Sequence, residues 1–170
     1  RSIFAVWQEY QGLGLLGGMG HASDILRQGF LFILSFLFDI RFLRYIYTFL
    51  MLVIGPLGVY KLSRLFLGQE EDNKKDWAAY LAGLFYLLNL VTVQVFYVPF
   101  EVFVTHYGFL PWLFYVAIVY YKSQNKKNLF LLLLVNLLSL TQGYVPTIFA
   151  VYLITLFIFF IFNFIHDKKL

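Results

Sequence analysis

The sequence predicts an all-α, polytopic bundle of transmembrane helices, and three observations lead to that prediction. First, 61% of the 170 residues are hydrophobic and only 13% are charged, whereas an average soluble domain is about 45–50% apolar and about 25% charged. Second, the chain contains uncharged stretches close to the roughly 20 residues that a spanning helix needs. Third, its lysines cluster between these stretches. This composition excludes a soluble domain and a disordered chain, and the absence of cysteine excludes a disulfide scaffold.

Five spans are expected from the distribution of charge along the chain. The uncharged stretch from Asn128 to Ile165 is too long for one helix and has about the length of two. A turn is expected near its middle, because Gly143 and Pro146 favour one. The expected spans are residues 42–64, 77–98, 106–121, 128–142 and 146–165.

Nine basic residues favour a helical hairpin for residues 128–165, that is, two spans joined by the turn, over a single long helix. With a turn at residues 142–146, all nine lie on one side of the membrane, which the positive-inside rule makes cytoplasmic; they are Lys61, Arg64, Lys74, Lys75, Lys122, Lys126, Lys127, Lys168 and Lys169. The net charge of +4 is therefore explained by orientation, and no nucleic-acid partner is expected. We interpret the chain as part of one transmembrane domain of a longer, multi-pass protein. Residues 1–41 form an external loop with a short interfacial helix over residues 29–38, and residues 42–170 form the transmembrane helices.

A glycine-rich segment in the external part is the first candidate site. Five glycines fall within residues 12–20, which disfavours a helix and permits a ligand to approach the backbone closely. The polar and titratable residues around it are Glu9, Tyr10, His21, Ser23, Asp24 and Arg27. A carboxylate, an imidazole and a guanidinium at a membrane surface can bind a phosphate-bearing lipid and remove a proton from a hydroxyl group. The alternative is a plain loop in which Ser23 or Asp24 caps the following helix.

Two other motif interpretations of the same region are rejected. Gly12, Gly14 and Gly17 match the dinucleotide-binding pattern, but that pattern works only between a strand and a helix of a parallel sheet. The histidines follow no metal-binding spacing, so no metal site is predicted, and the sequence does not indicate a cofactor.

Glu101 is the second candidate, because it lies in an apolar and aromatic loop on the same external side. A carboxylate at the membrane boundary is costly unless it is paired or solvated, which makes it a functional candidate. The alternative is a water-exposed loop acid. His106 follows five residues later and is expected either to bind substrate or to form an interfacial hydrogen bond. Arg27 and Arg41 lie near acidic residues, which indicates ion pairing or ligand binding.

The segment Trp7–Arg27, followed by a short apolar helix and alternating spans, resembles the front part of polytopic glycosyltransferases of the GT-C type. The likeness is to the membrane domain of mycobacterial-type arabinofuranosyltransferases and to related large uncharacterised bacterial membrane proteins. Residues 97–101 (Tyr-Val-Pro-Phe-Glu) and residues 109–112 (Phe-Leu-Pro-Trp) also look like that group.

This resemblance implies an enzyme of the bacterial inner membrane. Such enzymes take a sugar from a polyprenyl-phosphate donor, place it on a glycan acceptor at the outer face with inversion, and use an acid of the first external loop as general base. On this chain, the resemblance and the residues together give Asp24, Glu9 and Glu101 as catalytic candidates. The substrate-binding candidates are His21, Arg27, Tyr10, Arg44 and His106. By the same comparison, the family's first span and the start of that loop would lie upstream of Arg1, which leaves open whether the catalytic acid lies there or is one of these three residues.

Two other functions stay open at this stage. A transporter or lipid flippase would have broken or polar spans, and Gly55-Pro56 and Asn89 supply one break and one polar residue. A non-catalytic membrane subunit is the third possibility. Asn89 and Asn136 lie within predicted spans and are expected to form interhelical hydrogen bonds.

Overall fold

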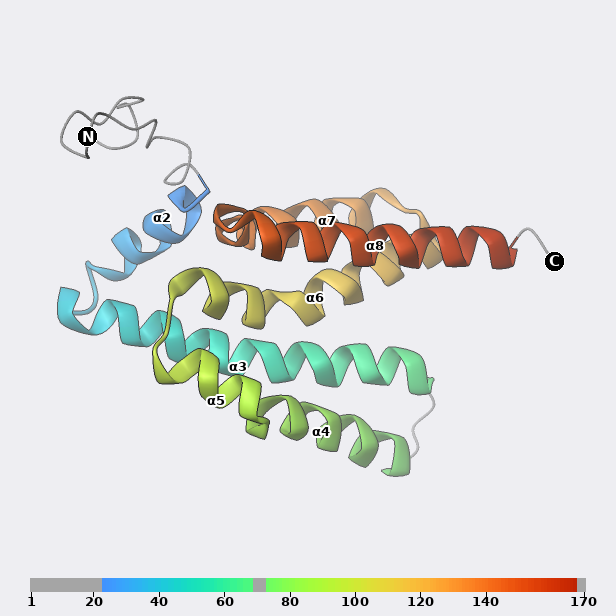
Figure 1. The fold of residues 1–170 in the computed structure, drawn as a ribbon, viewed down its shortest axis with the longest axis horizontal. Helices are drawn as coiled ribbons and strands as arrows, with labels where there is room; N and C mark the ends of the chain where they lie inside the picture. The colour runs from blue at the N-terminus through green and yellow to red at the C-terminus, as the bar shows by residue number, and fades with distance from the viewer. Residues whose placement is uncertain (1–22, 69–72, 168–170) are drawn as a thin grey trace.

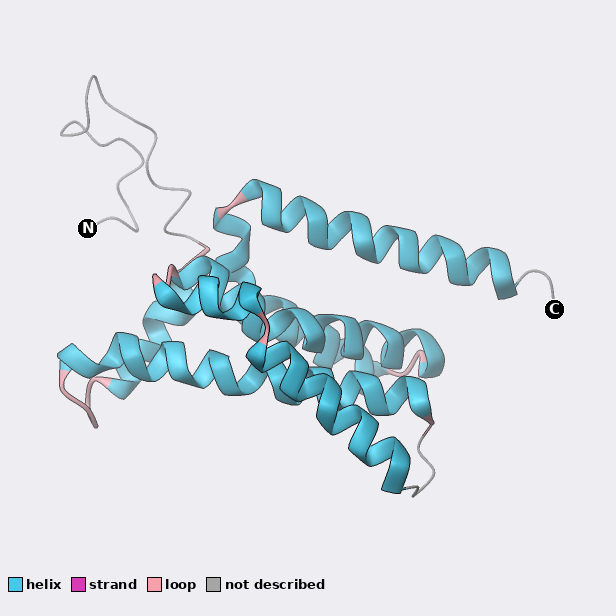
Figure 2. Ribbon diagram, turned by 60° about the horizontal axis from the view of Figure 1, so that its bottom comes forward, coloured by secondary structure: helices cyan, strands magenta, loops and turns pink. Residues whose placement is uncertain are grey.

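The computed structural model describes residues 23–68 and 73–167, and over these residues every regular element is helical (Figure 1). The elements are α2 (Ile25–Leu34), α3 (Ile40–Leu67), α4 (Asn73–Leu88), α5 (Leu90–Tyr97), α6 (Glu101–Ser123), α7 (Lys126–Leu138), the 3-10 helix η1 (Leu140–Tyr144) and α8 (Pro146–Asp167). The connections drawn as loops in Figure 2 are short. The all-α prediction is therefore confirmed for this part of the chain. The glycine-rich segment, with Glu9, Tyr10 and His21, lies outside the described residues.

Two of these helices, α3 and α6, are long and apolar enough to cross a membrane. The pair α4 and α5 would make a third span, bent by 44° at the break between the two helices. Helix α7 has 13 residues and thus a length of about 20 Å, and α8 counts among the shorter apolar helices over Pro146–Ile161. The chain thus has the helices of a membrane protein, and the number of five spans stays a prediction.

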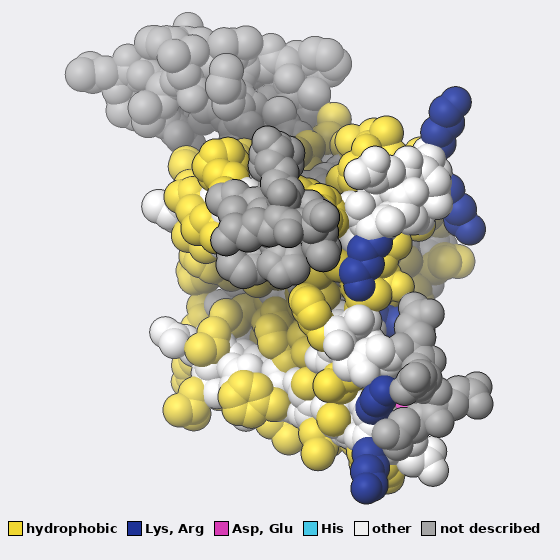
Figure 3. Space-filling model, turned by 90° about the vertical axis from the view of Figure 1, so that its right-hand side faces the viewer, with side chains coloured by type: hydrophobic (Ala, Val, Ile, Leu, Met, Phe, Trp, Pro, Cys, Tyr) yellow, Lys and Arg dark blue, Asp and Glu magenta, His cyan; other side chains and the backbone are white. Residues whose placement is uncertain are grey.

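Successive helices run back and forth between two ends of the molecule, as the predicted hairpin requires. In Figure 1 one end carries α2, the start of α3, the α5–α6 junction and η1. The opposite end carries the end of α3, the start of α4 and the α6–α7 turn, and Figure 3 shows lysine and arginine side chains gathered there. We call this second end the lysine end.

Helix α3 lies between α4 and α6, and glycines allow close contact on both sides. A Cβ atom on Gly58 would lie 2.7 Å from Cδ1 of Trp112 on α6, and one on Gly83 of α4 would lie 3.0 Å from the carbonyl oxygen of Pro56. Trp112 also donates a hydrogen bond from Nε1 to the carbonyl oxygen of Ile54, at 2.9 Å. Small residues that let helix backbones approach are typical of membrane helix packing.

The third predicted span begins earlier than expected, because α6 starts at Glu101 and not at residue 106. The supposed loop over residues 99–105 is therefore mostly helix. Pro99 stands before the helix, and Glu101 occupies its first turn, where a negative charge is favourable beside the positive end of the helix dipole. The short helix α2 is likewise shifted, to Ile25–Leu34 from the predicted 29–38.

The two asparagine predictions have different outcomes. Asn136 of α7 accepts a hydrogen bond from the hydroxyl of Tyr152 on α8 at 2.7 Å, so its interhelical role is confirmed. The prediction for Asn89 was wrong, because its side chain bonds locally. It accepts from the backbone N–H of Thr92 and donates to the carbonyl oxygens of Phe85 and Tyr86. Asn89 therefore caps α5 and divides the α4–α5 span.

Candidate functional site

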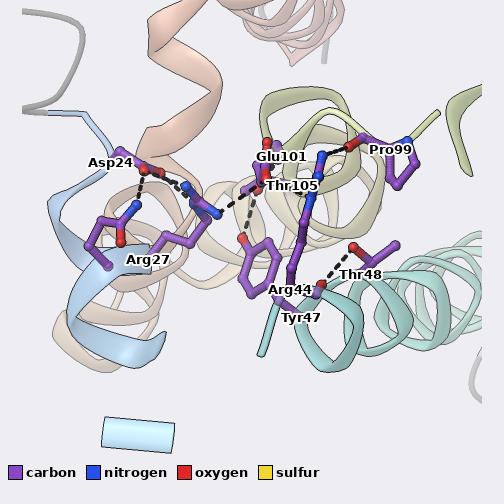
Figure 4. A network of polar contacts seen from close by, with 9 residues as sticks. Asp24, Arg27, Arg44, Tyr47, Thr48, Pro99, Glu101 and Thr105 are labelled. Atoms are coloured by element: carbon purple, nitrogen blue, oxygen red, sulfur yellow. Dashed lines mark hydrogen bonds and ion pairs between the residues drawn. The ribbon is translucent and has the colours of Figure 1, made fainter. Parts of the chain in front are cut away.

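Four charged side chains from three helices meet at the end opposite the lysine end (Figure 4). Asp24 and Arg27 come from the start of α2, Arg44 from the first part of α3, and Glu101 from the first turn of α6. We call these four residues the arginine–acid cluster. The four residues come together because α2 packs on α3, and because the junction between α5 and α6 lies at the same end of the molecule as α2.

Asp24 and Arg27 form a bidentate pair. Arg27 donates from Nε to Asp24 Oδ1 at 2.6 Å and from Nη2 to Oδ2 at 2.5 Å, and Gln28 donates to Oδ2 at 2.8 Å. Burial raises the pKa of the Asp24 carboxyl, but the hydrogen bonds from Arg27 and Gln28 outweigh it and leave the pKa below its ordinary value. Asp24 stands at the N-cap position of α2, yet its side chain makes no capping bond. The predicted ion pairing is thus confirmed, and capping by the Asp24 side chain is not observed.

Glu101 lies between the two arginines. Its Oε1 atom is 3.0 Å from Arg44 Nε and 4.0 Å from Arg27 Nη1. Arg44 also donates from Nη2 to the carbonyl oxygen of Pro99 at 2.8 Å, which fixes its head group beside the start of α6. The Glu101 side chain is 30% exposed. Its carboxylate can therefore be reached by a bound molecule and can accept a proton from it.

Two buried hydroxyl groups, those of Tyr47 and Thr105, connect α3 to α6 beside the cluster. Tyr47 donates to Thr105 Oγ1 at 2.7 Å, and Thr105 donates to the carbonyl oxygen of Glu101 at 2.5 Å. The Arg27 guanidinium lies over the Tyr47 ring, 5.7 Å from its centroid, in a cation–π contact. Sequence reasoning missed both residues. Helical spacing could have found them, because Tyr47 follows Arg44 by three residues and Thr105 follows Glu101 by four.

A cavity of about 420 Å³ opens beside the cluster. Arg27, Arg44 and Glu101 supply charge to its wall, and Gln28 and Ser35 supply polar groups. The rest of its wall is apolar and consists of Leu31, Phe32, Ile40 and Leu43. Two guanidinium groups suit an anionic group such as a phosphate, and an apolar wall suits a hydrocarbon chain.

His106 has a structural contact and does not line this cavity. Its Nδ1 atom lies 2.8 Å from Gln142 Oε1, and because an amide oxygen only accepts, the imidazole donates there. Gln142 is buried in η1 and donates in turn to Ser139 Oγ at 3.0 Å. His106 therefore holds η1 against α6, which matches the hydrogen-bonding alternative for this residue.

The structure thus brings Asp24, Arg27, Arg44 and Glu101 together and leaves His106 apart. Among the described residues, no group of three or more potential ligand side chains is placed to hold a metal ion. Comparisons of the chain with protein families, characterised proteins and solved structures found no match.

Proposed function

We propose that this chain is part of a membrane glycosyltransferase that uses a polyprenyl-phosphate-linked sugar donor and a glycan acceptor at the outer face of a bacterial inner membrane. One observation carries the proposal. Glu101 lies between two arginines at the wall of a cavity whose other side is apolar. A lipid-linked phosphate needs cationic and apolar contacts side by side, and transfer to a hydroxyl group needs a base beside them. Five spans, with the lysine end cytoplasmic, form part of the same proposal.

In this proposal Arg44 and Arg27 bind the donor phosphate, and Leu31 and Phe32 contact its hydrocarbon chain. Glu101 is the general base. Its carboxylate takes the proton of an acceptor hydroxyl, whose oxygen then bonds to the anomeric carbon while the bond from that carbon to the phosphate oxygen breaks. The phosphate leaves with one more negative charge, which the two guanidinium groups stabilise. A single displacement of this kind inverts the anomeric configuration.

Asp24 takes a different role in this mechanism from the one predicted for it. Both of its oxygens accept hydrogen bonds from Arg27, and its lowered pKa makes it a weaker base. Asp24 therefore positions Arg27, which in turn faces Glu101 across 4.0 Å.

Replacing Glu101 by Gln in the full-length protein tests the proposal. We expect the E101Q variant to lose about 10²–10⁴-fold in the rate of sugar transfer, the usual contribution of a general base. The matched control is D39N: Asp39 is an exposed acid that caps the start of α3 and does not line the cavity. Transfer from a polyprenyl-phosphate sugar to a glycan is measured in membranes. An E101Q variant as active as D39N would remove Glu101 from the mechanism.

The arginines are tested by the dependence of the rate on donor concentration. We expect R44Q to raise the KM for the lipid-linked donor, because it removes a charge at the phosphate. Arg41 provides the control, since it lies one turn earlier on α3, is 84% exposed and does not line the cavity. A KM for the donor that is the same in R44Q and R41Q would contradict phosphate binding by Arg44.

A lipid flippase or transporter is the second candidate, and the divided α4–α5 span favours it. Helices interrupted near the membrane midplane are typical of transporters, and Asn89 interrupts the α4–α5 span. Movement of a fluorescent polyprenyl phosphate across vesicles that hold the protein, without any sugar transfer, would favour this alternative over the transferase.

A further inference from the structure

Tyr47 of α3 contacts both neighbouring helices that carry the arginine–acid cluster. Towards α2, the centre of its ring lies 5.7 Å from the guanidinium carbon of Arg27 and 6.3 Å from the ring centre of Phe30. Towards α6, its hydroxyl is directed at Thr105 (Figure 4), 2.7 Å away. Only 4% of Tyr47 is exposed, so these contacts are shielded from water. One buried side chain therefore links α2 and α6 to α3 beside the cluster.

The direction of the hydroxyl chain follows from the protons available. Thr105 has one hydroxyl proton, which it donates to the carbonyl oxygen of Glu101 at 2.5 Å. Its Oγ1 atom therefore accepts from Tyr47, which is the donor of the second bond. Thr105 is fully buried, so water cannot replace either bond. The chain thus runs from α3 to the backbone of the first residue of α6.

The start of α6 depends on this chain because the helix has no side-chain cap. Its N-cap residue, Phe100, makes no capping bond, and the amide groups of a first helical turn have no partner within the helix. Such helix ends open most readily. Arg44 contacts the side chain of Glu101, whereas Thr105 holds its backbone. The hydroxyl chain therefore restricts where the Glu101 carboxylate lies.

The position of Arg27 depends on the ring of Tyr47. The hydrogen bonds of a guanidinium lie in its own plane, so the bonds of Arg27 to Asp24 do not limit its movement out of that plane. Contact with an aromatic ring does limit it. None of the ten residues of α2 is buried, so the helix has little other packing to fix the arginine.

We propose that Tyr47 is a positioning residue for the transfer reaction, and that its two parts serve different substrates. The ring holds Arg27 at the phosphate of the lipid-linked donor. The hydroxyl, through Thr105, holds Glu101 at the acceptor hydroxyl. Tyr47 does not line the cavity and acts only through these neighbours. This inference rests on the proposed function, but the contacts on which it depends can be measured without sugar transfer.

The hydroxyl is tested by Y47F, which removes it and keeps the ring. The matched control is Y152F, because Tyr152 is 2% exposed and also donates one hydrogen bond at 2.7 Å, to α7 and away from the cavity. In the full-length protein, we expect Y47F to lower kcat about 10–100-fold without changing the KM for the donor. We also expect faster hydrogen exchange of the backbone amides of residues 101–105. T105V should have both effects, and T105S, which keeps the hydroxyl, should have neither.

The ring is tested at constant shape by placing 3,4,5-trifluorophenylalanine at position 47 and comparing this protein with Y47F. Fluorine withdraws electron density from the ring face and weakens a cation–π contact. Calorimetry measures the binding of farnesyl phosphate, a short polyprenyl phosphate. We expect Y47F to bind it as the unchanged protein does, and the fluorinated ring to raise the Kd about threefold. The same residue at position 152, where the ring packs on Phe114 and Phe149, should leave the Kd as in Y152F.

The outcomes distinguish this inference from the proposed function. If the unchanged protein transfers no sugar, the proposed function fails, and amide exchange and farnesyl phosphate binding still decide the role of Tyr47. Equal amide exchange of residues 101–105 in Y47F and Y152F would overturn the role of the hydroxyl, as would equal kcat values in an active protein. Farnesyl phosphate that does not bind, or a Kd that fluorine at position 47 does not change, would overturn the role of the ring.

Discussion

Replacing Gly58 by Ala should destabilise the protein, although alanine is the better helix former. The residue is buried on α3, and an added Cβ would lie 2.7 Å from Cδ1 and 2.8 Å from Nε1 of Trp112 and 3.0 Å from Cβ of Pro111. The indole cannot withdraw without loss, because its Nε1 donates to the carbonyl oxygen of Ile54 at 2.9 Å. The new methyl group therefore separates α3 from α6 or breaks this hydrogen bond.

The free energies involved decide the sign of the effect. Alanine in place of glycine gains about 1 kcal/mol of helix propensity. Overpacking costs about 1–3 kcal/mol, and loss of the indole hydrogen bond adds about 1 kcal/mol. The net expectation for G58A is a loss of about 1–3 kcal/mol in the free energy of unfolding. Gly29 supplies the control, because nothing lies within 4 Å of a Cβ at that position and it stands inside α2. We expect G29A to gain about 0.5–1 kcal/mol.

Thermal unfolding of the purified protein in detergent micelles measures both variants. A loss of 1–3 kcal/mol corresponds to a fall in Tm of about 2–12 °C for a chain of this size. Adding W112F to the G58A variant should recover part of the loss, because the smaller ring makes room for the methyl group. A Tm for G58A at or above that of the unchanged protein would refute the tight α3–α6 contact.

The remaining predictions concern the ion pairs. In double-mutant cycles, we expect the Asp24–Arg27 pair to show a coupling energy of about 1.5–3 kcal/mol, because it is bidentate and its side chains are 17% and 12% exposed. The Asp39–Arg41 pair, 3.9 Å apart and 54% and 84% exposed, should give a coupling energy of about 0–0.5 kcal/mol. Equal coupling energies for the two pairs would contradict the stronger interaction expected for Asp24 and Arg27. Since the folded-state pKa of Asp24 is lowered, its stabilisation is present above the unfolded pKa of about 3.9 and is lost as the pH falls through the folded-state value. Unfolding of D24N should therefore depend less on pH below about 4 than unfolding of the unchanged chain.

Much of the helical arrangement could be predicted from composition and charge. The uncharged stretches predicted the positions of α3 and α6. The lysine pattern predicted that successive helices alternate in direction, which places the turn between α7 and α8 at the same end of the molecule as α2. The break at Asn89 could not be predicted in this way, because hydropathy does not distinguish an asparagine that bonds to a neighbouring helix from one that bonds to its own backbone.

Within the candidate site, local sequence predicted the pairing of Arg27 with Asp24, three residues away. The contact of Arg44 with Glu101 could not be predicted, since it depends on how α3 packs on the start of α6. The expected spans 77–98 and 106–121 placed Glu101 in the loop between them, whereas α6 begins at Glu101, and a proline shortly before a helix is compatible with its start. The loop prediction therefore hid the position of Glu101 in the first helical turn.

The central claim is that the arginine–acid cluster and the lysine end lie on opposite sides of the membrane. The chain contains no cysteine, so single cysteines can report on its orientation. Ser35 lines the cavity at the cluster, and Ser123 is exposed at the end of α6 on the lysine side. In intact cells, we expect a membrane-impermeant maleimide to label S35C, and to label S123C only after the membrane is permeabilised. Labelling of both cysteines in intact cells would contradict the outward-facing site.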